Sequence, residues 1–358
     1  MDLKHPMDTS LVSRDFGTLS DGRVVEAWTL RGSAGLELEV LTYGGIVSRL
    51  LVPDRDQNLA DVVLGFGKLE GYVGEHPYFG TTAGRVAGRI SGGRITLDGT
   101  TYKLPINDPP NHLHGGPESI DKQLWQAEVI TRADGSPSLR LKYHSPDGEN
   151  GYPGDVDLAV TYTVTAANEF VFETEVSSNR ATPVSLTHHS YFNLGGEGEG
   201  NILNHHLRID SDTIFQSDEK MTLLDEPQSV DGQAADFREM KRVGDAIHNV
   251  WQKHGDLYWF GETDQCRAVA QLRDFASGRV LDVSTTNSCL QMYGAVALDG
   301  SLTGKSGRFY STFGGLCLEC QGYPNAIGPT TAKGFGDIVV HPGSPSRNTT
   351  IYAFSTQP

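Results

Sequence analysis

Glu319 lies in an otherwise apolar stretch near the end of the sequence, at residues 316–324. The alternation of side chains along this stretch predicts a buried strand, with Glu319 on the same face as Cys317 and Gln321. Because an unpaired carboxylate is costly to bury, we expect Glu319 to have a partner. That partner could complete a structural ion pair, or it could exchange protons with Glu319 during a reaction.

Two histidine-bearing segments far upstream could supply this partner. His112 and His114 would share one face of an extended segment, and strand alternation places His189 on the face opposite His188. An imidazole titrates near neutral pH, so a histidine facing the carboxylate would form a proton-transfer pair. Each histidine alone could equally be a hydrogen-bonded core residue. The His-x-His spacing also occurs in zinc sites, but no third ligand follows at helical spacing, which favours hydrogen bonding.

Further polar side chains have the chemistry to bind a ligand. Arg85 and Arg89 stand among glycines, where other groups can approach the backbone and a guanidinium can fork onto a hydroxyl or a carboxylate. Asp256 precedes aromatic residues, a composition found both in sugar sites and in plain edge strands. Gln291 would lie on the face opposite its apolar neighbours, where its amide could bond a ligand hydroxyl.

Composition excludes several classes of protein. The 358 residues include 37% hydrophobic and 21% charged side chains, which is ordinary for a soluble globular protein. A formal net charge of −16 argues against nucleic-acid and anionic membrane partners. The sequence has neither a signal-like apolar start nor an apolar stretch long enough to span a bilayer. We therefore expect a cytoplasmic protein, either a monomer or a homodimer.

The cysteines do not indicate a disulfide scaffold or a metal site. There are four in the whole sequence, and reduced thiols suit the cytoplasm. Cys317 and Cys320 have the C-x-x-C spacing of metal and redox motifs. On a strand, however, their sulfur atoms would point to opposite faces and could not share one ion. We expect no metal.

Short strands separated by dense turn signals run along the sequence. Alternating or β-branched runs occur at 36–41, 139–143 and 156–164, and Asp98-Gly99 is a strong hairpin signal. This pattern predicts an all-β fold, a large antiparallel sandwich or barrel, with short helices at 69–72 and 240–249. No linker or composition shift divides the sequence, so we expect residues 1–358 to form one domain, with residues 1–10 as a flexible tail.

Several motifs in one order give these residues a context. The order is Gly-Arg-Val-Ala-x-Arg-Ile, Asn-x-Leu-His-Gly-Gly, His-Ser-Tyr-Phe-Asn-Leu, Gln-x-Tyr and Cys-Leu-Glu-x-Gln-x-Tyr-Pro. Together they resemble the aldose 1-epimerase (galactose mutarotase) family, from about residue 43 through the final strands. The resemblance implies a large antiparallel β-sandwich with an open cleft, in agreement with the strand pattern.

The resemblance also implies roles for individual residues. Glu319 matches the general base that takes the proton of the anomeric hydroxyl, and His189 matches the general acid that protonates the ring oxygen. Four positions match residues that hold the sugar, namely Arg89, His114, Asp256 and Gln291. The implied reaction interconverts the α and β anomers of a free galactose- or glucose-like aldose by ring opening and reclosure. It needs no cofactor, because one acid and one base exchange protons with one substrate.

Three positions depart from the family pattern. Gly88 stands where the family usually has Asn, which removes an amide that would bond a sugar hydroxyl, and Leu257 and His188 replace His and Asn. These departures keep open a mutarotase-like isomerase recruited to another hemiacetal or lactol. A carbohydrate-binding protein without turnover is a further alternative, although a pure binder would not need both Glu319 and His189.

Overall fold

The computed structural model describes residues 9–224, 226–250, 255–327 and 335–357. Most of the tail expected at residues 1–10 lies outside the described residues, and the first strand begins at Ser10. Within these ranges there are two α-helices, α1 (Leu69–Val73) and α2 (Val243–Val250), and 3-10 turns at Ser91–Gly93, Ile120–Lys122 and Glu149–Gly151. None of the helices in these described ranges has the length and apolar composition needed to cross a bilayer.

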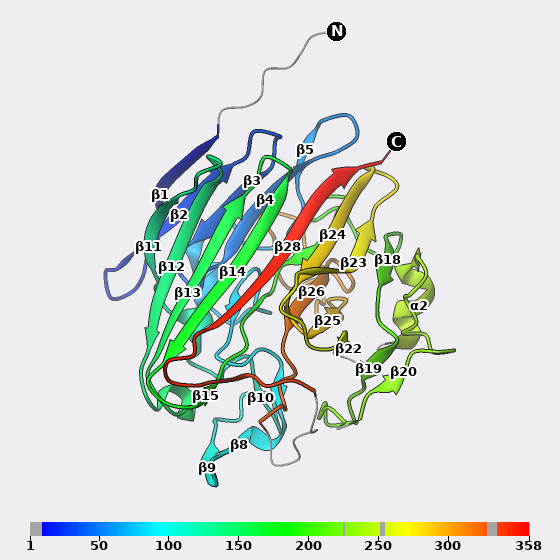
Figure 1. Ribbon diagram of the computed structural model, residues 1–358. Helices are drawn as coiled ribbons and strands as arrows, with labels where there is room; N and C mark the ends of the chain where they lie inside the picture. Colours follow the sequence, from blue (N-terminus) through cyan, green and yellow to red (C-terminus); the bar gives the residue numbers. More distant parts are fainter. Residues whose placement is uncertain (1–8, 225, 251–254, 328–334, 358) are drawn as a thin grey trace.

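Three antiparallel sheets carry the architecture (Figure 1). The nine-stranded sheet has the order β11 (Gln126–Thr131), β12 (Pro137–Ser145), β13 (Val156–Val164), β14 (Glu169–Ser178), β28 (Ser346–Thr356), β24 (Arg279–Thr285), β23 (Arg267–Arg273), β18 (His206–Ile209) and β21 (Lys241–Arg242). The six-stranded sheet has the order β17 (Tyr191–Phe192), β26 (Leu316–Gln321), β25 (Cys289–Tyr293), β22 (Leu257–Trp259), β19 (Thr213–Phe215) and β20 (Gln228–Ser229).

The third sheet and four short ribbons complete the strand inventory. The five-stranded sheet consists of β1 (Ser10–Thr18), β2 (Val24–Arg31), β3 (Glu37–Leu41), β4 (Val47–Pro53) and β5 (Leu59–Asp61). The two-stranded ribbons pair β6 (Thr82–Ala83) with β16 (Thr187–His188), β7 (Arg89–Ile90) with β10 (His112–Leu113), β8 (Arg94–Leu97) with β9 (Thr100–Lys103), and β15 (Thr182–Pro183) with β27 (Val339–Val340).

The five- and six-stranded sheets pack against the nine-stranded sheet and share one apolar core with it (Figure 1). On β26, Leu318 and Cys320 point into this core, where Tyr352 of β28 donates its hydroxyl hydrogen to the Leu318 carbonyl at 3.2 Å. Strand alternation then turns Cys317 and Glu319 to the other face of β26, as the sequence predicts. The predicted all-β sandwich is confirmed, and the sulfur atoms of Cys317 and Cys320 do point to opposite faces.

Local sequence signals explain several elements. The run at 156–164 forms β13 over the same residues, and Asp98-Gly99 closes the hairpin of β8 and β9 with φ angles of 48° and 77°. The helix expected at 69–72 is α1. The one expected at 240–249 begins later, at Val243, because residues 241–242 pair with β18.

Arg85 is buried and binds the protein rather than a ligand. Its guanidinium donates to the Ser145 hydroxyl at 2.7 Å and to the backbone carbonyls of Ser145, Pro146, Pro153 and Gly154 at 2.8–3.2 Å. Arg85→Leu would leave these acceptors unsatisfied, so we expect unfolding stability to fall by at least about 3 kcal/mol. Urea denaturation measures this.

Arg347→Leu is the matched control, because the Arg347 side chain is 64% exposed and pairs only at the surface with Glu175. We expect its stability to change by less than about 0.5 kcal/mol. Equal effects of the two substitutions would contradict a structural role for the hydrogen bonds of Arg85.

Candidate active site

A cleft of about 220 Å³ opens at the face of the six-stranded sheet that points away from the shared core. Strands β25 and β26 supply Gln291, Tyr293 and Glu319 to its floor, in adjacent register because Gln291 pairs with Glu319. The remaining lining residues come from loops and short strands, namely Pro77, Tyr78, Gly88, Arg89, Asp108, Leu113, His114, His189, Tyr191, Ser217, Met221, Leu223, Gly255, Ala297 and Pro324.

Glu319 is the buried acid of this cleft. Only 2% of its surface is exposed, and burial raises the pKa of Glu319 to about 8. Its Oε2 atom has no hydrogen-bond partner among the described residues. Buried polar atoms are almost always satisfied, so an unsatisfied oxygen facing a cleft indicates a place for a ligand hydroxyl.

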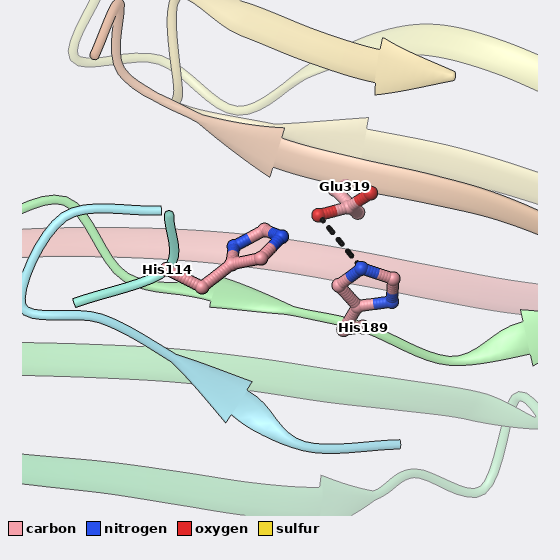
Figure 2. A group of neighbouring side chains, drawn as sticks. All are labelled: His114, His189 and Glu319. Atoms are coloured by element: carbon pink, nitrogen blue, oxygen red, sulfur yellow. Dashed lines mark ion pairs between the residues drawn. The ribbon is translucent and has the colours of Figure 1, made fainter. Parts of the chain in front are cut away.

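His189 faces Glu319, as Figure 2 shows. The backbone of His189 is fixed by a hydrogen bond from its N–H to the Thr81 carbonyl at 2.9 Å. Its ring stacks between Tyr78 and Tyr191, at centroid distances of 5.9 and 5.2 Å. This places His189 Nε2 3.5 Å from Glu319 Oε2. This distance is slightly longer than a usual hydrogen bond, so a small movement of either side chain would bring the carboxylate and the imidazole into hydrogen-bond contact.

One proton can be exchanged between these two groups. Burial lowers the pKa of His189 to about 4 while it raises the pKa of Glu319 to about 8. Desolvation thus disfavours both charges and favours the neutral acid together with the neutral imidazole. The ion pair of carboxylate and imidazolium contains the same number of protons, so a ligand that stabilises the two charges can move the proton without help from solvent.

His114 presents a hydrogen-bond donor to the same space. Its Nδ1 atom accepts a hydrogen bond from the Gly88 backbone N–H at 3.2 Å, so the neutral ring carries its hydrogen on Nε2. Burial lowers the pKa of His114 well below its usual value, with a further contribution from His189. Nitrogen and oxygen atoms of His114, His189 and Glu319 lie within 4.8 Å of one another. The tautomer of His114 argues against a metal there, because its Nε2 has no lone pair to offer.

Arg89 and Gln291 also reach the cleft, as the sequence predicts. Arg89 begins β7, and its Nε donates to the Asp108 carboxylate at 2.6 Å. Gln291 lies on β25 directly beside Glu319, and its amide nitrogen donates to the Met292 carbonyl at 3.2 Å. Both side chains therefore have hydrogen-bonding groups within the cleft wall that contains Glu319.

Asp256 is the one predicted site residue that is not among the described residues lining the cleft. It immediately precedes β22, and its backbone carbonyl accepts a hydrogen bond from the Met292 N–H at 3.1 Å. The neighbouring Gly255 lines the cleft, whereas Asp256 does not. Burial raises the pKa of Asp256 to about 7. Five of the six predicted residues thus line the cleft, and Asp256 directly follows Gly255, which also lines it.

The other two histidines do not assist. Both ring nitrogens of His112 are engaged, Nδ1 with the Pro105 carbonyl at 2.7 Å and Nε2 with the Tyr152 hydroxyl at 2.8 Å. His188 lies on the opposite side of the chain from His189, where its ring contacts Phe170 and its Nε2 bonds the Ser190 hydroxyl at 2.7 Å. These are the hydrogen-bonded core histidines that the sequence left as an alternative.

The positions that depart from the family pattern have local explanations. Gly88 has a φ of 78°, and a Cβ there would lie 2.8 Å from Pro324 Cγ and 2.9 Å from Gln321 Nε2. A side chain at Gly88 would therefore displace a neighbour before it could reach a sugar hydroxyl. Leu257 is fully buried in a small apolar cluster with Phe215 and Tyr323.

Sequence reasoning missed several cleft residues. Tyr78, which stacks on His189, has a φ of 58° and comes from a loop without a recognisable motif. Ser217 and Met221 come from a second loop, and Asp108 lies in the loop before His112. The one signal in the sequence was that Asp108 is an acidic residue next to two prolines. Such a residue does not predict a site unless its partner is known.

Comparisons with known proteins show the family of this chain. The sequence model described as aldose 1-epimerase matches residues 26–353. Galactose mutarotase from Rattus norvegicus is 40% identical over 343 residues, covering 95% of this chain and 97% of its own. Aldose 1-epimerase from Escherichia coli strain K12 is 30% identical over 341 residues, covering 93% and 96%. The crystal structure of galactose 1-epimerase from Lactobacillus acidophilus NCFM is similar with a TM-score of 0.84 at 24% identity, covering 98% and 100%.

The matched family and its relatives show that the protein is an isomerase, and the Lactobacillus acidophilus structure shares its fold. The chain belongs to the aldose 1-epimerase family, and its activity is that of a mutarotase. Neither alternative from the sequence, the recruited lactol isomerase or the binding protein without turnover, gains support from these relatives.

Proposed function

We propose that this protein interconverts the α and β anomers of a free galactose-like aldose, with Glu319 as the general base and His189 as the general acid. The observation that carries the proposal is the pairing of a buried, unsatisfied carboxylate oxygen with an imidazole nitrogen 3.5 Å away, inside a cleft. The choice of galactose rests on the name of the mammalian relatives, galactose mutarotase.

The proposed reaction begins at the anomeric hydroxyl. Glu319 takes the proton from O1, the C1–O5 bond breaks as the C1–O1 double bond forms, and O5 receives a proton from His189 Nε2. The free aldehyde turns about its C1–C2 bond. O5 then returns its proton to His189 and attacks the other face of C1, while Glu319 gives its proton back to O1. The pair thus contains one proton before and after each turnover, and no cofactor takes part.

Hydrogen-bond donors around the pair would hold the sugar in place. The Nε2 hydrogen of His114, the guanidinium of Arg89 and the amide of Gln291 all reach the cleft. Neutral donors and one paired cation suit a polyhydroxy substrate, because each can bond a hydroxyl oxygen without attracting a competing charge. We include Asp256 as a sugar-binding residue, because it directly follows Gly255, which lines the cleft.

The pH dependence of kcat/KM should be bell-shaped. Below about pH 4, both His189 and Glu319 are protonated, so the pair contains no base. Above about pH 8, Glu319 loses the one proton that the pair shares, so no acid remains. We therefore expect a plateau between these values, measured by anomer exchange across buffers of constant ionic strength. A rate that rises steadily through pH 9 would contradict the shared proton.

Saturation-transfer NMR across a panel of free aldoses tests the proposed function. Exchange between anomers of galactose that is faster than the spontaneous rate, and proportional to protein concentration, would support it. The same panel ranks glucose and pentoses against galactose. Acceleration of other aldoses but not of galactose would overturn the choice of sugar, and acceleration of none would overturn the proposal.

Four further expectations extend this proposal. We place the protein in the cytoplasm, as one domain and as a monomer or homodimer. The formal charge of −16 supports the absence of nucleic-acid and anionic membrane partners. The free thiols of Cys289, Cys317 and Cys320 are buried and suit a reducing compartment.

A further inference from the structure

Asp108 brings a negative charge to the cleft wall that the proposed proton transfers do not use. Its carboxylate accepts a hydrogen bond from Arg89 Nε at 2.6 Å, and the two side chains are only 24% and 17% exposed. At such partial burial, the charges interact more strongly than they would in bulk water. The opposite charges of Arg89 and Asp108 therefore compensate each other at the cleft wall, where a substrate would bind.

The loop of Asp108 is held rigidly. The backbone groups of Asp108 and Asn111 exchange two hydrogen bonds, at 3.2 and 2.7 Å. Asn111 is fully buried, and its side-chain nitrogen donates to the Lys220 carbonyl at 2.9 Å. This contact ties the loop to the second loop of the cleft, which contains Met221. Asp108 is thus positioned by the fold and is not a mobile surface carboxylate.

Arg89 is the one basic side chain among the described residues that line the cleft, apart from the two histidines. Burial lowers the pKa of His114 and His189 and keeps both rings uncharged near neutral pH. Lys122 lies behind Tyr78, with its ammonium 5.6 Å from the ring centroid. A substrate anion would therefore find its only direct cation already paired with a carboxylate.

We propose that Asp108 is a specificity-determining residue, which neutralises Arg89 so that the cleft accepts neutral aldoses and excludes sugars that carry a carboxylate. The inference rests on the proposed function, because it concerns the choice among aldoses at the same site. Without Asp108, the cleft wall would lose one negative charge and the charge of Arg89 would be compensated less. This change favours a substrate anion, for which arginine is a favoured partner. The preference of the cleft for neutral sugars over anionic sugars would therefore decrease.

Galactose and galacturonate provide the test, because they differ only in having a hydroxymethyl or a carboxylate at C6. Anomer exchange gives kcat/KM for each sugar with the wild-type protein and with Asp108→Asn. We expect the galacturonate-to-galactose ratio to rise about 10- to 100-fold in the variant. An unchanged ratio, or a wild-type protein that uses both sugars equally, would overturn the proposal.

Asp157→Asn is the matched control, because it makes the same change of net charge at an exposed position on β13. Its ratio should equal that of the wild type; an equal rise would attribute the effect to net charge and overturn the proposal. Asp108→Ser is a second variant, which removes the same charge with a smaller side chain. Its galacturonate-to-galactose ratio should rise as it does in Asp108→Asn, because the Arg89 guanidinium loses the same carboxylate partner. An unchanged ratio in folded Asp108→Ser would overturn the inference.

Binding separates this inference from the proposed function. If the wild-type protein accelerates neither sugar, the proposed function fails, and calorimetric titration with each sugar still measures the affinity ratio. A rise of that ratio in Asp108→Asn would support the role of Asp108. An unchanged affinity ratio would overturn it, as would failure of both sugars to bind either protein.

Discussion

Glu319→Gln should lower the rate of anomer exchange by roughly 10²–10⁴-fold, because it removes the proposed base and keeps the shape of the side chain. The amide cannot take the proton of the anomeric hydroxyl, so ring opening would depend on water. Sugar binding should persist within several-fold, since the donors on His114, Arg89 and Gln291 remain in place. Saturation-transfer NMR measures the exchange, and calorimetric titration measures the affinity.

Glu39→Gln is the matched control for this change. Glu39 is also buried, at 5% exposure, but it lies on β3, where it accepts hydrogen bonds from Ser48 and Arg14 at 2.8 and 2.9 Å. It should alter stability and leave the exchange rate per folded molecule near that of the wild type. If Glu319→Gln retained the wild-type rate, Glu319 would not be the base. If it lost sugar binding together with turnover, its role would be substrate positioning.

Much of the fold could be predicted because its signals are local. Residues 156–164 alternate along their whole length and form β13 without a shift of boundary, and Asp98-Gly99 has the turn chemistry that a tight hairpin requires. The burial of Glu319 was predictable for the same reason, since its neighbours along the strand are apolar. Alternation also separated His189 from His188 correctly.

The rest of the site depends on contacts between segments that local patterns do not relate. The tautomer of His114 is set by the Gly88 backbone, 26 residues away, and requires a φ of 49° at His114 itself. The pairing of Arg89 with Asp108 spans 19 residues and two loops. Asp256 was singled out by its aromatic context and by the resemblance, and its neighbour Gly255 lines the cleft instead. Such geometry follows from tertiary packing, which a single sequence does not specify.

His189→Gln should also lower the exchange rate by roughly 10²–10⁴-fold, and it should change the pH profile in a way that loss of structure would not. In the wild-type protein the active form contains one proton on the pair. In the variant only Glu319 titrates, and its carboxylate form is the active one. Residual exchange should therefore rise with pH through the raised pKa of Glu319, about 8, instead of declining there.

His188→Gln provides the neighbouring control. Its ring contacts Phe170 and Phe172 in the core, so the variant is expected to lose stability but to keep a bell-shaped profile once it is folded. An unchanged pH profile in His189→Gln would mean that the acidic and alkaline declines of the rate do not arise from Glu319 and His189. The general acid would then be another hydrogen-bond donor of the cleft. His114 would be examined next, since its Nε2 hydrogen faces the same space. If His189 is the proton donor, the rate of the His189→Gln variant should rise through about pH 8, where the wild-type rate falls. A His189 ring that only packs against Tyr78 and Tyr191 would not produce this change.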